Sequence, residues 1–383
     1  MRILAMGNVE LLPHLGSGKT RLGWREGFAG HGHSYEPVTP PAFEMAFGKT
    51  IRARKYRQAI GALLWFWKNP GWREYDIIEF HGDEFWLATL WLSRQRRRPL
   101  IIASTDGLEL LAYDRHAFDD MNRGRLGPLK KLGNRLTHES WGKIAFRRAD
   151  RFASICKLDA DYMQKQGYFT PAHCVVAAPG LDVEYSSCDP AILKEHAIAF
   201  NGSWIERKGI STLIKVADTL LREDERLEFH VFGTGGKEAL VRASFDPSLH
   251  ARIHVYGRLS NSDLAHGLAR CKVFIFPSEY EGFGIALGEA MACSCACVTT
   301  PTGYGWELKD GEEAFIRPFG DHNGMTVAAR QLLTNPTLLQ AISSSGRDRA
   351  RQLRWDTSAE ALIHAYEQWL EEYQSRQNGF SRK

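Results

Sequence analysis

The chain has 383 residues, which is long for a single hydrophobic core, so we expect two domains of roughly 180 residues each. Its content of 44% hydrophobic and 25% charged residues excludes a disordered or collagen-like protein. No apolar run is long enough for a transmembrane helix, and residues 1–10 resemble a first strand more than a signal peptide. These features predict a cytoplasmic globular protein.

Short apolar runs ending at Gly or Pro alternate with helical periodicity along the chain, a pattern typical of parallel sheets built from βα units. In the first half we predict strands at 2–6, 76–80, 100–104, 151–155 and 174–178. In the second half we predict strands at 197–201, 227–232, 252–256, 273–276 and 296–299. Each set is sufficient for its own sheet, and the turn-rich segment 178–190 between them predicts the interdomain linker.

Two helices are predicted from their apolar spacing. The first spans 209–222 and places five apolar side chains on one face: Leu213, Val216, Ala217, Leu220 and Leu221. The second begins at Asp356 or Thr357, both good capping residues, and shows a similar face: Leu362, Tyr366, Trp369 and Tyr373. Both helices are therefore expected to pack on a sheet.

The seven cysteines lie in segments predicted to be buried, as expected for reduced thiols. Cys293, Cys295 and Cys297 do not have a zinc-ligand spacing, so we expect small side chains on one face of a strand.

The net charge of +4 hides an asymmetry between the two halves. Residues 1–180 carry 27 Lys and Arg against 18 Asp and Glu, whereas the remainder carries 22 against 27. Basic clusters at 52–57, 94–98 and 123–151, together with Trp65 and Trp67, suit an anionic membrane surface, and solvated helix faces are the alternative. Nucleic acid is not expected as a partner, because acidic residues interrupt the basic clusters and no recognised binding fold is present.

A glycine-rich turn follows the first predicted strand. Gly16-Ser-Gly-Lys-Thr20 resembles the end of a phosphate-binding P-loop, but Pro13 occupies the position where that motif needs its first glycine. What remains is either a plain turn or a loop whose N–H groups approach a phosphate or a sugar hydroxyl. On the second interpretation Gly16 and Gly18 are candidate ligand-binding residues.

Three stretches carry a resemblance to a known family: 200–209 (FNGSWIERKG), 277–293 (PSEYEGFGIALGEAMAC) and 302–311 (TGYGWELKDG) followed by FGD at 319–321. In order and spacing they are similar to glycosyltransferase family 4, the retaining enzymes of the GT-B fold. Weaker similarities at 148–151, 178–182 and 353–356 extend the resemblance over most of the chain.

The resemblance implies an α/β protein with two Rossmann-like domains facing across a cleft and a C-terminal helix that returns to the first domain. We expect an N-terminal acceptor-binding domain at 1–183 with the helix at about 358–383. The nucleotide-sugar-binding domain is expected at 184–357.

Sugar transfer breaks the bond between an anomeric carbon and a diphosphate, so fixed cations must meet the charge that develops on the leaving group. Arg207 and Lys208 follow a predicted strand at the carboxyl edge of the sheet, where ligands of open α/β sheets gather. The resemblance assigns Glu281 to the transferred sugar and Glu289 to the ribose. The expected catalytic residues are therefore Arg207, Lys208, Glu281 and Asp106.

The expected donor-binding residues lie in both halves of the chain: Gly16, Gly18, Gly202, Ser203, Arg258, Leu259, Gly282, Phe283, Gly284, Ile285 and Glu289. Ser203 stands where the family usually has Arg. Asp106 lies in 104–107, where the family often has His-Gly, so it either holds the donor sugar or an acceptor hydroxyl or is an ordinary turn residue. His81 is expected at the same edge in a capping or loop role, and a catalytic role is the alternative.

The sequence therefore predicts a retaining transferase of polysaccharide or glycolipid synthesis. It would move a hexose from a nucleoside-diphosphate sugar, UDP-glucose type first, to a glycan or lipid-linked acceptor. No cofactor or metal is expected, and localisation is cytoplasmic with association at the inner membrane face. The alternatives are a nucleotide-sugar epimerase of the same architecture and an inactive nucleotide-sugar-binding protein.

Overall fold

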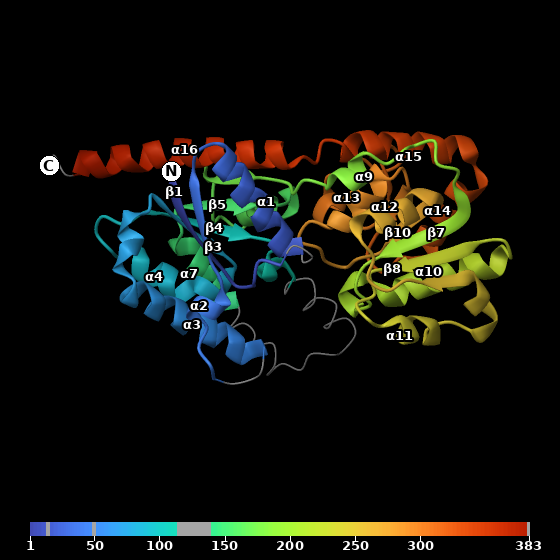
Figure 1. Ribbon diagram of the computed structural model, residues 1–383, viewed down its shortest axis with the longest axis horizontal. Coiled ribbons are helices and arrows are strands. Elements are labelled where there is room, and N and C mark those ends of the chain that lie inside the picture. Colours follow the sequence, from blue (N-terminus) through green and yellow to red (C-terminus); the bar gives the residue numbers. More distant parts are fainter. Residues whose placement is uncertain (13–15, 48–50, 113–138, 381–383) are drawn as a thin grey trace. The chain divides into compact units, whose positions relative to one another are not determined.

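The computed structural model describes the chain except residues 13–15, 48–50, 113–138 and 381–383 (Figure 1). It divides into two compact units, unit 1 comprising Met1–Gly180 and Trp355–Lys383 and unit 2 comprising Leu181–Arg354. Each unit holds one six-stranded sheet whose paired strands are all parallel. The predicted α/β class with two parallel sheets is confirmed, and the division falls three residues before each expected boundary.

Unit 1 has the strand order β2-β1-β3-β4-β5-β6. Its strands are β1 (Arg2–Gly7), β2 (Ser34–Val38), β3 (Ile77–His81), β4 (Leu100–Thr105), β5 (Arg151–Ser154) and β6 (Cys174–Val176). Its α-helices are α1 (Gly16–Gly30), α2 (Pro40–Phe43), α3 (Ile51–Lys68), α4 (Trp86–Leu92), α7 (Ser140–Arg148), α8 (Lys157–Lys165) and α16 (Trp355–Phe380). Its 3-10 helices are η1 (Pro70–Glu74), η2 (Asp83–Phe85) and η4 (Pro171–His173).

Strand β2 was not predicted from the sequence, because Pro37 lies inside it. Proline lacks an N–H donor and is normally confined to edge strands, and β2 pairs only with β1 at the edge of the sheet. Because β2 lacks the continuous apolar run of a central strand, the pattern used for the other strands could not identify it.

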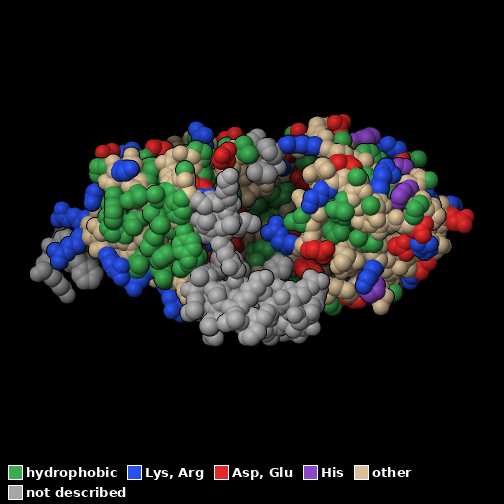
Figure 2. Space-filling model, turned by 90° about the horizontal axis from the view of Figure 1, so that it is seen from below, with side chains coloured by type: hydrophobic (Ala, Val, Ile, Leu, Met, Phe, Trp, Pro, Cys, Tyr) green, Lys and Arg blue, Asp and Glu red, His purple; other side chains and the backbone are tan. Residues whose placement is uncertain are grey.

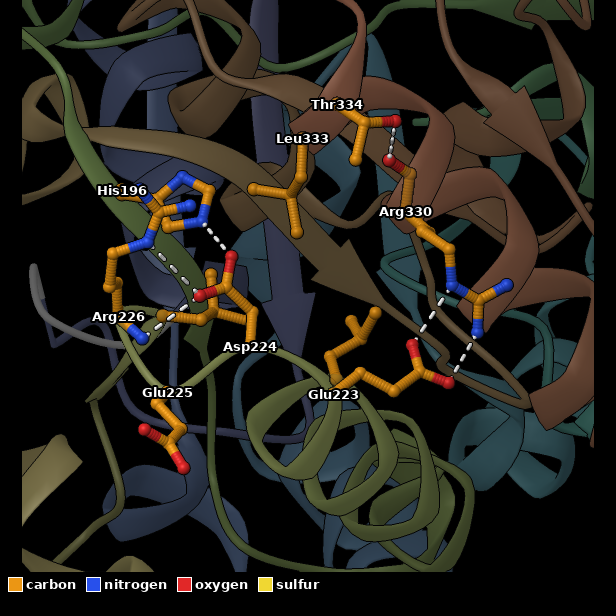
Figure 3. A pocket seen from close by; sticks show the side chains of 10 residues that line it. His196, Glu223, Asp224, Glu225, Arg226, Arg330, Leu333 and Thr334 are labelled. Carbon is orange, nitrogen blue, oxygen red and sulfur yellow. Dashed lines mark hydrogen bonds and ion pairs between the residues drawn. The ribbon is translucent and has the colours of Figure 1, made fainter.

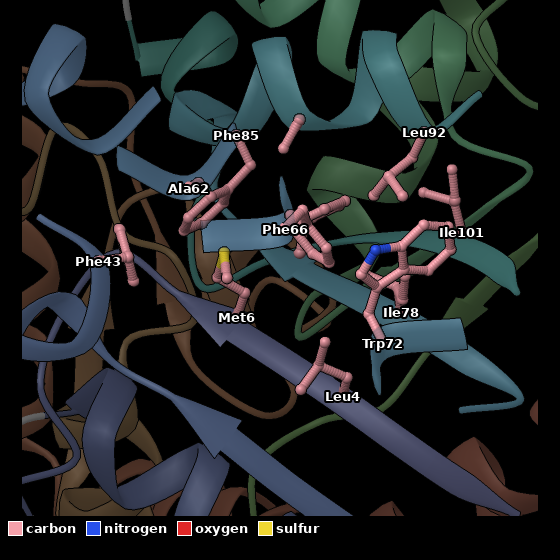
Figure 4. Packing of buried hydrophobic residues seen from close by; sticks show 12 residues of the cluster. Leu4, Met6, Phe43, Ala62, Phe66, Trp72, Ile78, Phe85, Leu92 and Ile101 are labelled. Atoms are coloured by element: carbon pink, nitrogen blue, oxygen red, sulfur yellow. The ribbon is translucent and has the colours of Figure 1, made fainter. Parts of the chain in front are cut away.

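One face of the unit 1 sheet forms the apolar core under α3 and α4. Leu4 and Met6 of β1 and Ile78 of β3 lie with Phe66 of α3 in this cluster, which Figure 4 shows from close by. Trp72 of η1 is 1% exposed and closes the same cluster. Burying each such large side chain contributes about 1.5–3 kcal/mol, so this face fixes the positions of the strands that lead to the carboxyl edge.

The opposite face of the same sheet contains buried polar groups beneath α1 and α16. Glu79 of β3 is fully buried and accepts a hydrogen bond from the Tyr366 hydroxyl of α16 at 2.8 Å. His81, the last residue of β3, lies 2.9 Å from the Tyr35 hydroxyl and 3.4 Å from Glu79. The expectation of a capping or loop role for His81 is wrong, because its ring is enclosed in this network. Helix α16 thus completes unit 1, as expected for the returning C-terminal helix.

Unit 2 has the strand order β12-β11-β10-β7-β8-β9. Its strands are β7 (Glu195–Asn201), β8 (Glu228–Phe232), β9 (Ile253–Val255), β10 (Cys271–Phe276), β11 (Ala296–Thr299) and β12 (Phe315–Ile316). Its α-helices are α9 (Val183–Ser186), α10 (Ile210–Glu223), α11 (Glu238–Ala243), α12 (Asn261–Arg270), α13 (Ile285–Ala292), α14 (His322–Thr334) and α15 (Pro336–Ala350). Its 3-10 helices are η5 (Glu206–Lys208), η6 (Pro247–Arg252) and η7 (Gly303–Trp306).

Two details of unit 2 differ from the prediction. Strand β12 has only two residues, too few for a periodic pattern, and was not predicted. Of the three closely spaced cysteines, only Cys297 lies in a strand, whereas Cys293 follows α13 and Cys295 lies between. All three are free and buried, so the expected face of one strand is instead a buried turn that leads into β11.

The Tyr366 hydrogen bond yields a prediction about the attachment of α16. Tyr366→Phe removes the hydroxyl that donates to the buried carboxylate of Glu79, a bond to a charged group worth roughly 1.5–3 kcal/mol. We expect a loss of unfolding free energy of that order, measured by urea unfolding. Tyr373→Phe on the same helix is the matched control, since its hydroxyl donates to the neutral Arg98 carbonyl at 3.1 Å and should cost about 1 kcal/mol. Equal losses in the two variants would contradict a special role for Glu79.

Candidate functional site

The strand order of unit 2 creates a topological switch point between β7 and β10. From β7 the chain proceeds through β8 to β9 on one side, and from β10 through β11 to β12 on the other. Loops that leave the carboxyl ends of these two neighbouring strands diverge, which opens a crevice where ligands of open α/β sheets bind. Lys208 follows β7 and Glu281 follows β10, so the topology brings these two predicted residues to the same crevice.

Lys208 and Glu281 form a direct ion pair at this point. The Lys208 Nζ lies 2.6 Å from Glu281 Oε1 and 2.9 Å from Oε2, with side chains 16% and 8% exposed. The same ammonium lies 5.6 Å from the centre of the Phe276 ring. Removing either partner would leave an uncompensated charge at a nearly buried position, which is costly.

Glycines allow the two loops to approach each other. Gly209 has a positive φ of 68°, and a Cβ there would lie 2.0 Å from the Pro277 carbonyl oxygen. Directly beside it, the Glu279 N–H donates to the Arg207 carbonyl at 2.9 Å. A side chain at 209 would separate the loops, so this glycine sets the distance between Lys208 and Glu281.

The loop after β10 leads into α13 through Gly284, whose φ is +88°. Phe283 and Gly284 are buried, whereas Ile285 is partly exposed at the start of the helix. The first-turn N–H groups of a helix lack intrahelical acceptors and favour anions. Gly282, Phe283 and Gly284 thus lead directly from Glu281 to Ile285 at the start of α13, and their role in donor binding stays a prediction.

Glu289 lies in the second turn of α13, as expected, and is 7% exposed. The pKa of Tyr185 in α9 is raised mainly by burial, and the negative charge of Glu289 is the second largest cause. Glu289 therefore faces the segment that opens unit 2. The structure places it on the helix that begins beside Glu281.

The remaining predicted residues of unit 2 also lie at the carboxyl edge of its sheet, at different distances from the Lys208–Glu281 pair. Gly202 packs beside Lys208, since a Cβ there would lie 3.8 Å from Lys208 Cε. Ser203 and Arg207 are exposed in the same loop. Arg258 and Leu259 follow β9, which is two strands from β7 in the sheet. Since neighbouring strands are about 4.8 Å apart, the ends of β9 and β7 are separated by roughly 10 Å.

The other predicted residues belong to unit 1. The Asp106 Oδ2 lies 4.0 Å from Arg21 Nε, and burial raises the pKa of Asp106 although the charges of His81 and Arg21 oppose it. Gly16 and Gly18 form the first turn of α1, and a Cβ on Gly18 would lie 2.3 Å from the Leu12 carbonyl oxygen. Gly18 is therefore required for packing. Pro13 lies outside the described residues.

Sequence reasoning missed Arg21. This buried arginine of α1 donates to the Val9 carbonyl at 3.0 Å, and its guanidinium occupies the space where Gly7 would carry a Cβ. The signal in the sequence was an arginine in the helix that follows a strand ending in glycine, a position where most side chains are apolar.

A second missed group follows β3 at the carboxyl edge of unit 1. Lys55 of α3 lies 3.2 Å from Asp83 and also contacts Glu109, while Asn8 donates to Glu84 at 3.0 Å. Burial raises the pKa of Asp83 to about 6 and that of Glu84 to about 7. The sequence signal was the pair of acidic residues directly after the strand.

Several members of the predicted basic clusters are engaged within unit 1. Arg57 lies 2.7 Å from Glu44, Arg98 lies 2.6 Å from Asp150, and Arg151 lies 2.8 Å from Glu372. With Lys55 these cations stabilise the unit internally. Part of the 123–151 cluster, residues 123–138, lies outside the described residues. Among the described helices, none has an apolar stretch of the length that a bilayer crossing requires.

A cavity of about 560 Å³ lies away from the predicted site, beside the start of β7 and the connection from α10 to β8. Figure 3 shows Asp224 joined to His196 and Arg226, and Glu223 joined to Arg330. His196 Nε2 lies 2.8 Å from Asp224, and Arg330 lies 2.7 Å from Glu223. These residues are at the amino end of the strands, opposite the switch point, and none of them was predicted as a site residue.

Residues 195–335 match the family described as Glycosyl transferases group 1. Among curated proteins, the chain is 22% identical over 294 residues to the 2-deoxystreptamine N-acetyl-D-glucosaminyltransferase of Niallia circulans, covering 75% of each chain. It is 24% identical over 170 residues to an uncharacterized glycosyltransferase of Methanocaldococcus jannaschii, covering 44% of this chain and 47% of the other. The match thus spans about half of that second relative.

Solved structures share the fold over nearly the whole chain. The sucrose-phosphate synthase of Thermosynechococcus elongatus aligns with a TM-score of 0.72 and 16% identity over 97% of this chain and 100% of the other. Anabaena HepE, solved in complex with UDP, aligns with a TM-score of 0.67 and 15% identity over 98% and 100%. The chain has the GT-B fold, and the match to the group 1 glycosyltransferase model lies within its second unit, at residues 195–335.

The raised pKa of Glu84 yields a prediction about pH. The carboxyl group of Glu84 binds a proton more tightly in the folded state than in the unfolded chain. The contribution of Glu84 to the free energy of unfolding therefore rises as pH falls from 8 through the folded pKa near 7. Glu84→Gln removes the buried charge and keeps an acceptor for Asn8. We expect a gain of roughly 1–3 kcal/mol at pH 8 that shrinks towards pH 5, measured by thermal unfolding.

Glu74→Gln is the matched control, because Glu74 is exposed and its side chain contacts only the exposed Arg2 among the described residues. It should change neither the midpoint nor its pH dependence. A Glu84→Gln variant whose stability follows the wild-type pH curve would contradict the burial of an ionised Glu84.

Proposed function

We propose that the chain is a retaining glycosyltransferase of family 4 type that transfers a hexose from a nucleoside-diphosphate sugar, with UDP-glucose the first donor to test. The acceptor is a glycan or a lipid-linked glycan precursor. One observation carries this proposal: the nearly buried Lys208–Glu281 pair at the switch point of a group 1 glycosyltransferase domain.

In the proposed reaction, the bond between the anomeric carbon and the β-phosphate oxygen breaks while the acceptor hydroxyl oxygen bonds to the same carbon. The acceptor proton passes to the leaving phosphate oxygen. Lys208 neutralises the diphosphate, helped by Arg207 and by the N–H groups at the start of α13. The family usually has an arginine where this chain has Ser203. Arg207 is therefore proposed as the second cation of this loop.

Glu281 is proposed to accept hydrogen bonds from the transferred sugar once Lys208 turns to the diphosphate. Its backbone N–H donates to Thr302 Oγ1 at 3.0 Å, which fixes the loop while the side chain exchanges partners. Glu289 on α13 is proposed to bind the ribose hydroxyls, and Asp106 of unit 1 the acceptor or donor sugar. The proposed reaction uses no metal or cofactor.

UDP as the nucleotide is supported by relatives rather than by the residues of this chain. Anabaena HepE and a Staphylococcus aureus TarM variant were both solved in complex with UDP. The fold also includes a putative UDP-N-acetylglucosamine 2-epimerase of Listeria monocytogenes, at a TM-score of 0.61. An epimerase would convert the donor without any acceptor, so it is separated from a transferase by identifying the product sugar.

Lys208→Met tests the role of the cation. We expect turnover, measured as UDP release from UDP-glucose, to fall about 100-fold to 1000-fold, the cost of one lost preorganised charge donor. Lys215→Met, on the exposed face of α10, is the control and should retain full turnover.

The double variant Lys208→Met with Glu281→Gln separates catalysis from folding. Removing both charges should restore the thermal stability lost in Lys208→Met, because no unpaired buried charge remains. Turnover should stay low. Recovery of turnover in the double variant would mean that the pair is only structural, and NMR of the product anomer decides retention.

We also propose that unit 1 associates with an anionic membrane surface, where a lipid-linked acceptor would reside. Figure 2 shows hydrophobic side chains gathered on one face of unit 1, with basic side chains at the edge. On α3 and α4, Trp67 is 55% exposed and its ring centre lies 6.3 Å from that of the partly buried Trp91. Arg94 and Arg96 are exposed just beyond α4, so apolar and basic groups adjoin as in interfacial surfaces.

Trp67→Ala should weaken binding to phosphatidylglycerol vesicles about 10-fold, since burying a large apolar side chain is worth roughly 1.5–3 kcal/mol. Co-sedimentation at low salt measures this. Trp306→Ala is the control, because Trp306 is 47% exposed but lies in unit 2. Wild-type protein that stays in the supernatant with anionic vesicles would remove the proposal.

A further inference from the structure

A group of histidine and glutamate side chains lies on one face of the unit 2 sheet, on β7, β8 and β9. His230 of β8 pairs in register with His254 of β9, so both rings lie on the same face. Glu228 precedes His230 by two residues and shares that face, because side chains alternate along a strand. Glu195 precedes Ala197 by two residues, and Ala197 pairs with Glu228, so Glu195 lies on this face as well.

The side-chain atoms converge. Glu228 Oε2 lies 3.5 Å from His230 Nε2 and 3.4 Å from His254 Nε2. One donor atom from each of the three residues lies within 4.8 Å of the others. Glu195 Oε2 lies 3.8 Å from His230 Nε2, while Glu195 Oε1 contacts Arg270.

The histidine nitrogens at the centre have no hydrogen bond. Within the described residues, the Nε2 atoms of His230 and His254 are both buried and without a hydrogen-bond partner. His230 is 8% exposed, so an unsatisfied nitrogen there is costly unless something else occupies the space.

The second nitrogen of the His230 ring contacts a hydroxyl that is able to accept its proton. Its Nδ1 lies 3.0 Å from the Tyr256 hydroxyl. When Nδ1 carries the proton and donates to that oxygen, Nε2 presents its lone pair to Glu228. A ligating histidine is commonly oriented by such a hydrogen bond on its second nitrogen.

The spacing of these atoms fits one kind of ligand. In a tetrahedral zinc site with bonds of about 2.0–2.1 Å, neighbouring ligand atoms are about 3.3–3.4 Å apart. The two Glu228–histidine distances are close to this value. Calcium and magnesium prefer sets of oxygen ligands, whereas two imidazoles with carboxylates suit zinc.

We propose that Glu228, His230 and His254 bind one Zn²⁺, with Glu195 as the fourth ligand. The ion would join the three outer strands of the sheet, of which β9 is a short edge strand. This role is structural. Glu195 and Glu228 are the first residues of β7 and β8, so the site is separate from the Lys208–Glu281 crevice at the carboxyl ends of the strands.

The test uses the full chain, freed of metal with EDTA, kept reduced, and titrated with ZnCl₂ in a calorimeter. We expect one Zn²⁺ per chain and a rise in the thermal unfolding midpoint. CaCl₂ at the same concentration should do neither. His254→Gln should weaken zinc binding by at least the roughly 10-fold to 100-fold that loss of an outer-shell partner causes.

Glu228→Gln provides a second variant at a partly exposed position, in case loss of His254 disturbs folding. His196→Gln is the matched control, because His196 of β7 also faces a carboxylate, Asp224, and within the described part of the chain no second histidine is paired with that carboxylate. It should bind zinc as the wild type does. The proposal is overturned if the wild type shows no stoichiometric binding. It is equally overturned if His254→Gln and Glu228→Gln bind like the wild type, which would assign the zinc to the cysteines.

Discussion

The parallel arrangement of the unit 2 strands is the constraint on which the candidate site depends. Because every paired strand runs in the same direction, each loop that follows a strand emerges at one edge. The switch between β7 and β10 then brings a lysine and a glutamate 73 residues apart in sequence to within 2.6 Å. Gly209 makes the contact possible, since a larger residue would collide with the Pro277 carbonyl. The chemistry proposed for this site therefore follows from topology first and from side-chain type second.

The two units handle charge differently. In unit 1, several basic residues that appear as surface clusters in the sequence are tied to acidic partners, as with Arg98 and Asp150, and Glu79 is held under α16. In unit 2, Lys208 at the switch point is paired with Glu281, the carboxylate that we propose a substrate phosphate displaces. An excess of positive charge in a sequence thus says little about ligand binding until the internal ion pairs are known.

Much of the fold could be predicted from the sequence, because buried parallel strands are short apolar runs and their helices have a clear apolar face. The exceptions have physical reasons: Pro37 disguises the edge strand β2, and β12 is too short to show a pattern. At the candidate site, the positions of Lys208, Glu281 and the glycines around Gly284 after strand ends could be predicted, while their roles stay predictions. Arg21, Glu84 and the His230–His254 group were not, since each depends on which strands and helices become neighbours, and a single sequence does not specify that register.

The C-terminal helix has a consequence for how the protein is made. Unit 2 is continuous, whereas unit 1 contains residues from both ends of the chain, with α16 packed on α1 and bonded to Glu79. During synthesis the first six strands emerge early, yet the partner for their buried carboxylate is translated only after the whole of unit 2. The later unit can therefore finish folding before the earlier one, which reverses the usual order in which domains form on the ribosome. Until then, the surface under α16 stays exposed, and a chaperone could bind it.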